Sequence, residues 1–80
     1  MALSPELQEE VNLLLQFDLS TTLAGLKVHS KADASAVEAA ARLYRKGLVD
    51  HVDGGYLTAL GREVAEHLQA ARRILQANPQ

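Results

Sequence analysis

Apolar residues recur along the N-terminal segment at the spacing of one face of an α-helix. The residues that share this face are Leu7, Val11, Leu14 and Leu15. Ser4 followed by Pro5 is typical of a helix start, because serine caps a free backbone N–H and proline fits the first helical position. The pattern predicts a helix over residues 5–16, with Phe17 anchoring its exit in the core.

The segment that follows has two interpretations. In the first, which we favour, Ser20 or Thr21 caps a short helix over residues 21–27. Alternatively, the alternation in Leu26-Lys27-Val28-His29 is typical of a short strand. Residues 29–34 are then expected to form a polar turn.

Alanine-rich sequence predicts a further helix over residues 35–46. Ser35 is a preferred N-cap residue, and Glu38 stands three positions later, where it would complete a capping box. Gly47 is the expected stop, since glycine commonly follows the last helical turn.

The apolar period then changes from helical to alternating. Residues 48–52 are typical of a strand, residues 53–55 (Asp-Gly-Gly) favour a turn, and residues 56–57 return as a second strand. Such a hairpin is not stable alone and must pack on the helices. Thr58 is expected to cap a last helix that continues to about residue 77.

The chain has 80 residues, which predicts one domain over residues 1–77 and a disordered tail over residues 78–80. It has no cysteine, which excludes disulfides, thiolate zinc sites and thiol catalysis. No apolar run reaches the roughly 18 residues of a membrane span, and the N-terminus is too acidic for a signal peptide. We therefore expect a cytoplasmic protein with no membrane contact.

The expected order of helix, helix, helix, hairpin and helix resembles a winged helix-turn-helix domain. Residues 42–49 (RLYRKGLV) are similar to the end of a recognition helix that runs into the first wing strand. Residues 53–62 (DGGYLTALGR) are similar to a wing tip, its return strand and the next helix start. This pairing is similar to that of bacterial regulators of the multiple-antibiotic-resistance and phenolic-acid-response classes. Over nearly its full length the chain also resembles short bacterial proteins of unassigned function to which DNA binding is attributed.

The resemblance implies a mainly α fold with a small β-hairpin and a small transcriptional regulator whose helix 35–46 enters the major groove of double-stranded DNA. The charge pattern agrees, because residues 27–47 carry five basic and two acidic residues, whereas residues 1–26 carry four acidic and no basic ones. The expected DNA-binding residues are Lys27, Lys31, Ser35, Glu38, Arg42, Arg45 and Lys46. The alternative is an ordinary solvated face in which Arg42 pairs with Glu38.

The last helix indicates self-association. Apolar residues near its end extend beyond what one small core requires, which predicts a homodimer. The expected interface residues are Leu68, Ala71, Ile74 and Leu75. The alternative is that the first helix covers this stripe within one chain.

The alternative function is that of a winged-helix protein–protein interaction module that binds no DNA.

Catalytic signals are weak. His29, His51 and His67 are dispersed, and no glycine-rich phosphate loop is present. We expect no enzyme, no cofactor and no metal site. Tyr44 and Tyr56 are expected to pack in the core.

Overall fold

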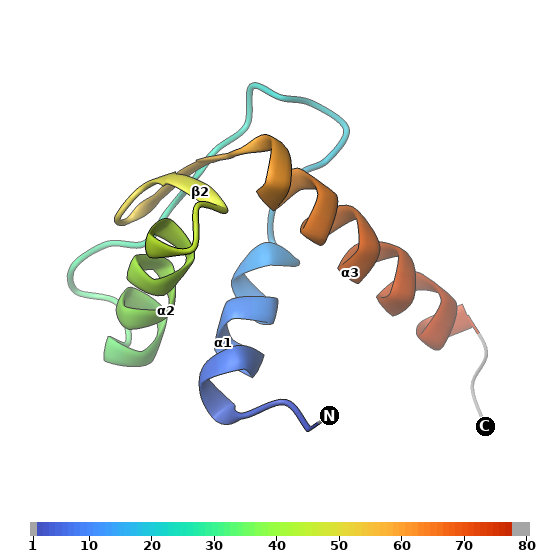
Figure 1. Ribbon diagram of the computed structural model, residues 1–80, viewed down its shortest axis with the longest axis horizontal. Coiled ribbons are helices and arrows are strands. Elements are labelled where there is room, and N and C mark those ends of the chain that lie inside the picture. The colour runs from blue at the N-terminus through green and yellow to red at the C-terminus, as the bar shows by residue number, and fades with distance from the viewer. Residues whose placement is uncertain (1, 78–80) are drawn as a thin grey trace.

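The computed structural model describes residues 2–77 and contains three α-helices and a small antiparallel sheet in that range (Figure 1). In chain order the elements are α1 (Pro5–Leu14), β1 (Leu26–Lys27), α2 (Ala34–Arg45), β2 (Val49–His51), β3 (Gly54–Leu57) and α3 (Ala59–Ala77). The mainly α fold with a hairpin is therefore confirmed. The predicted tail over 78–80 lies outside the described residues.

The first helix begins as predicted. The Ser4 hydroxyl accepts a hydrogen bond from the backbone N–H of Leu7 at 3.1 Å, and Pro5 occupies the first helical position. The helix ends at Leu14, two residues before the predicted end. Phe17 is buried at 5% exposure and anchors the turn that follows.

The favoured prediction of a helix over residues 21–27 is wrong. The alternative, a short strand, is confirmed at Leu26–Lys27. Leu26 pairs with Gly55 in β3, and the residues between α1 and β1 form turns and irregular backbone. The side chains of Asp18 and Thr21 accept hydrogen bonds from the backbone N–H groups of Ser20 and Leu23, at 2.9 and 3.0 Å. Such local side-chain bonds compete with helical ones and favour turns.

The absence of that helix changes the relation of α1 to α2. A helix-turn-helix joins two helices through a turn of about three or four residues. Here β1 and two irregular segments separate α1 from α2 within residues 2–77. The two consecutive helices expected before the hairpin are therefore not present in that range.

The second helix begins earlier than predicted. Asp33 is the N-cap residue, and its carbonyl accepts hydrogen bonds from the backbone N–H groups of Ala36 and Val37. Ser35 therefore lies inside the first turn, and the capping box with Glu38 was a wrong prediction.

The hairpin is confirmed, and β1 adds a third strand to give the order β1-β3-β2. Val52 and Asp53 form the turn, and the next two residues, Gly54 and Gly55, have φ angles of +119° and +78°. Residues with a side chain rarely adopt such backbone conformations, so glycine is suited to both positions. The sheet register also shifts between Val49 and His51.

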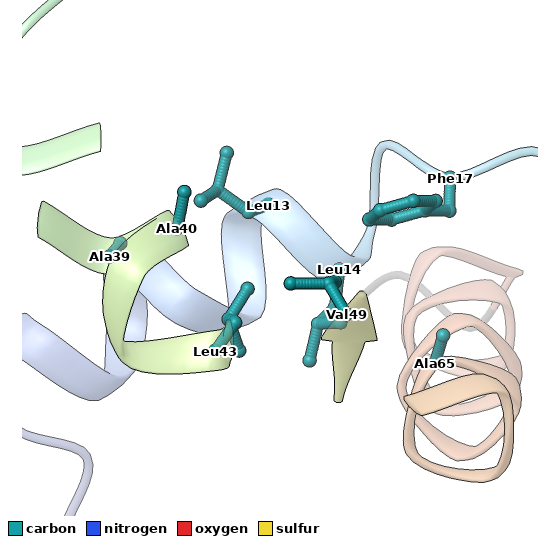
Figure 2. Close-up of a cluster of buried hydrophobic side chains, with 8 residues drawn as sticks. All are labelled: Leu13, Leu14, Phe17, Ala39, Ala40, Leu43, Val49 and Ala65. Carbon is teal, nitrogen blue, oxygen red and sulfur yellow. The ribbon is translucent and has the colours of Figure 1, made fainter. Parts of the chain in front are cut away.

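The core lies where α1, α2, the sheet and the first half of α3 meet. Figure 2 shows the buried cluster, which comprises Leu13, Leu14, Phe17, Ala39, Ala40, Leu43, Val49 and Ala65. Tyr44 and Tyr56 are each 46% exposed, so their predicted place in the core is wrong. The reason is that the core-facing side of α2 carries alanine and leucine, and Tyr44 lies outside it.

The last helix is capped as predicted. The Thr58 hydroxyl accepts from the backbone N–H of Gly61 at 3.0 Å and donates to the carbonyl of Gly47 at 2.6 Å. Gly61 and Ala65 are its buried residues, so α3 contacts the core through its first half. Its second half extends away from α1 (Figure 1). None of the helices in the described part of the chain combines the length and the apolar character that crossing a bilayer requires.

Candidate nucleic-acid interface

The expected DNA-binding helix presents three sides. One side is buried against the core, chiefly through Leu43. A second side faces α1, and a third faces the hairpin and the turn after β1. The outer edge between them, with Glu38 and Arg45, is exposed to solvent. The predicted contact residues are divided among these sides.

The side that faces α1 holds an ion-pair network. Glu10 of α1 is buried at 5% exposure. Its carboxylate accepts a hydrogen bond from Arg42 Nε at 2.7 Å and another from Lys46 Nζ. Arg42 also donates to the carbonyl of Glu6 at 3.1 Å. Arg42 and Lys46 therefore connect α2 to α1. Among the described residues Arg42 pairs with Glu10 and not with Glu38, the alternative partner.

The partners of Glu10 favour its ionised form although the residue is buried. Burial alone would raise the pKa of its carboxyl. Hydrogen bonds and the positive charges of Lys46 and Arg42 outweigh this effect, so the pKa is lowered from its ordinary value of 4.5. The network therefore stabilises the folded chain only while Glu10 carries its charge.

This lowered pKa predicts acid sensitivity. Near and below pH 4.5 the unfolded chain binds more protons at Glu10 than the folded chain does, so stability falls as the pH falls through the folded pKa. We expect the free energy of unfolding, measured by urea titration between about pH 7 and pH 3, to decrease less steeply in Glu10→Gln than in wild type. The pKa values of Asp18 and Asp50 are also lowered by hydrogen bonds. The free energy of unfolding of the variant therefore still decreases with falling pH, but less steeply. An identical slope in both proteins would contradict the assignment.

The side that faces the hairpin is hollowed. A depression of about 370 Å³ lies between α2, the turn after β1 and the hairpin tip. Its lining residues are Lys27, Val28, His29, Ser30, Val37, Ala41, Val52 and Asp53. The short side chains of Ala41 and Val37 leave this part of the helix accessible from outside. The hollow is therefore a concave surface on which an extended ligand can rest.

Three of the expected basic residues stay exposed, and one of them, Lys27, lines this surface. Lys27 lies in β1, Lys31 in the turn before α2, and Arg45 at the end of α2. Among the residues that the structure describes, none of the three forms a salt bridge. Ser35 and Glu38, by contrast, line a notch with the acidic residues of α1 and with Arg42.

One of the two acids of the hairpin has a structural role. Asp50 Oδ1 accepts a hydrogen bond from the backbone N–H of Tyr56 at 2.8 Å and lies 2.7 Å from His51 Nδ1. The backbone bond, followed by the bond to His51, lowers the pKa of Asp50. Asp50 therefore braces the two strands, while Asp53 lines the hollow.

The expected dimer residues lie on the second half of α3. Leu68 is half-buried and packs against the core, whereas Ala71 is exposed. Ile74 and Leu75 are 61% and 75% exposed. The first helix does not cover this end of α3, so the alternative in which it buries the whole stripe is wrong.

The buried carboxylate is the functional feature that sequence reasoning missed. Glu10 lies between Leu7 and Leu14 at helical spacing, so it falls on the apolar face of α1. An ionisable residue on a core-facing stripe requires a partner of opposite charge. That signal was present, although the identity of the partner was not.

Comparison with known proteins identifies the family of the chain. A protein-family model covers residues 1–76, and its description is a family of unknown function. No curated protein and no solved structure matches the chain.

Proposed function

The chain belongs to DUF5669, a family of unknown function, and we propose that it binds double-stranded DNA through α2 and the hairpin as a small transcriptional regulator. One observation carries this proposal. The outer edge of α2 is open to solvent beside a concave surface that Lys27 lines, and Lys27, Lys31 and Arg45 are all exposed without a salt bridge among the described residues.

The arrangement supports this use of α2. Contacts of α2 with β2 and β3 bring the hairpin beside the helix, in the manner of a wing that flanks a recognition helix. We therefore propose a winged-helix shape that lacks a helix immediately before α2. The major groove of B-DNA is about 12 Å wide and admits an α-helix. Small residues on the accessible part of α2, such as Ala34 and Ala41, permit close approach to the groove.

The network at Glu10 revises which residues contact DNA. Lys27, Lys31 and Arg45 are the proposed phosphate contacts, because none of them forms a salt bridge within the described residues. Arg42 and Lys46 instead fix the position of α2 against α1. Glu38 can accept a hydrogen bond from cytosine N4 at the outer edge.

A pair of charge-matched variants tests the proposal. Lys31→Ala/Arg45→Ala removes two cations beside α2, and Arg72→Ala/Arg73→Ala removes two exposed cations from α3. In fluorescence-anisotropy titrations with duplex DNA, each lost phosphate contact reduces the slope of log K against log salt by about 0.9. We expect a reduction of about 1.8 per copy in the first variant and a much smaller one in the second. Equal effects in both would show that only net charge matters and would reject this interface.

A second candidate is a protein-interaction module that does not bind DNA. The groove between α1 and α3 and the exposed end of α3 favour it. The same features support the homodimer that we propose as the form that binds DNA. If duplex DNA does not bind, the interaction module becomes the preferred function.

A further inference from the structure

The last helix carries an apolar seam that the DNA-binding proposal does not use. Val64, Leu68, Ala71 and Leu75 are separated by four, three and four positions, which is the alternating spacing of a coiled-coil seam. Val64 and Leu68 are half-buried, whereas Ala71 is exposed and Leu75 is 75% exposed. The seam therefore begins against the core and becomes open towards the end of α3.

The buried end of this seam opens into a groove beside α1. A space of about 180 Å³ is lined from α1 by Leu7, Val11 and Leu14 and from α3 by Val64 and Leu68. Leu43, Leu48 and the paired Glu10 and Lys46 complete its lining. Figure 1 shows α1 and α3 diverging from the end of the molecule where the sheet lies. Ala71 and Leu75 continue the stripe of Val64 and Leu68 along α3, so the groove and the open part of the seam together form one largely apolar surface.

We propose that α3 of a second copy of this chain occupies this surface, antiparallel to the first α3. A two-fold axis between Leu68 and Ala71 places Leu68 opposite the partner's Ala71 and Val64 opposite the partner's Leu75. Positions of the two seam types then face each other, as antiparallel coiled coils require. The same four residues on both copies complete the contact, so the interface is self-complementary.

The area that a stable dimer needs shows that α3 cannot act alone. The apolar part of α3 from Leu60 to Leu75 is about 23 Å long and about 10 Å wide, which is on the order of 230 Å² per copy. A standard interface buries about 800 Å² per partner. The partner's α3 must therefore also contact α1, and the half-buried Leu7 and Val11 of the groove are the residues available there.

The exposed Leu23 lies outside the helices and is not part of this seam. Leu23 is 83% exposed in the irregular segment before β1, away from any seam. Single exposed leucines are common in monomeric proteins, whereas a continuous apolar face indicates an interaction site. Leu23 therefore provides a matched control for the residues of α3.

Sedimentation velocity on the full chain without DNA tests the dimer. At micromolar concentration we expect wild type and Leu23→Asp to show an apparent mass of twice the 8.7 kDa of one chain. Leu75→Asp and Ala71→Asp are expected to sediment as folded monomers. A monomeric wild type, or a dimeric Leu75→Asp protein, would overturn the proposal. The inference deepens the proposed function, but this readout contains no DNA, so failure of either one is recognised separately.

Cross-linking tests the orientation, because the natural chain has no cysteine. A mixture of Val64→Cys and Leu75→Cys proteins is expected to form a mixed disulfide under mild oxidation. Leu75→Cys alone is expected to cross-link poorly, because the antiparallel arrangement separates the two copies of residue 75 by about 17 Å along the helix. Efficient cross-linking of Leu75→Cys to itself, with little mixed product, would indicate parallel helices and overturn the register.

Discussion

Replacing Gly61 with alanine is expected to lower the free energy of unfolding by about 3 kcal/mol. A Cβ atom at this position would lie 1.8 Å from the carbonyl oxygen of Leu48 and 2.8 Å from its carbonyl carbon. Both are backbone atoms, so the first turn of α3 has to move away from the start of β2. Helix propensity alone predicts the opposite sign, because alanine is favoured over glycine by about 1 kcal/mol inside a helix.

Urea unfolding of the two proteins, followed by circular dichroism, measures this effect. Gly47→Ala is the control, since Gly47 has a φ of +77° but a Cβ there would meet nothing within 4 Å. We expect that control to lose only about 1 kcal/mol through backbone strain. A Gly61→Ala protein as stable as wild type would show that α3 does not approach Leu48 this closely.

Replacing Arg42 with alanine is expected to destabilise the fold by about 2 kcal/mol, in the range of hydrogen bonds to charged groups. The loss leaves the buried Glu10 carboxylate with Lys46 as its only cation among the described residues. Arg45→Ala removes the same type of side chain from an exposed position in the same helix. We expect that variant to change stability by less than about 0.5 kcal/mol.

A double-mutant cycle separates the pair from the general effect of each substitution. The combination of Glu10→Gln with Arg42→Ala is expected to cost clearly less than the two single losses added together, since either change alone already breaks the contact. Strict additivity in urea unfolding would contradict the Glu10–Arg42 contact and would return Arg42 to the group of available DNA contacts.

Elements with local signals in the sequence were predictable. The Ser4 and Thr58 caps, the turn at Asp53 and the helical spacing in α1 and α3 all involve residues within one or two turns of each other. The strand β1 was not predictable with the same security, because its conformation depends on pairing between Leu26 and Gly55. Pairing between strands that are this far apart in the chain cannot be predicted from the residues of either strand alone.

The same limit applies to the candidate interface. The sequence identified the basic segment that contains Arg42, but local spacing offered Glu38 as its partner. The observed partner, Glu10, lies 32 positions earlier. Packing of α1 against α2 brings the two together. Arg42 and Lys46 are thereby paired with Glu10, although the Lys46 side chain stays 45% exposed. Lys27, Lys31 and Arg45 keep the exposure that the sequence-based proposal requires.

The most direct test of DNA binding is a fluorescence-anisotropy titration of wild-type protein against random-sequence duplex DNA at about 50 and 200 mM salt. Three phosphate contacts per copy predict that affinity falls by roughly 40-fold per copy over this range, because each contact releases condensed counterions. Absence of binding at the lower salt concentration, with protein shown to be folded, would contradict the proposal that α2 and its neighbouring cations form a DNA interface.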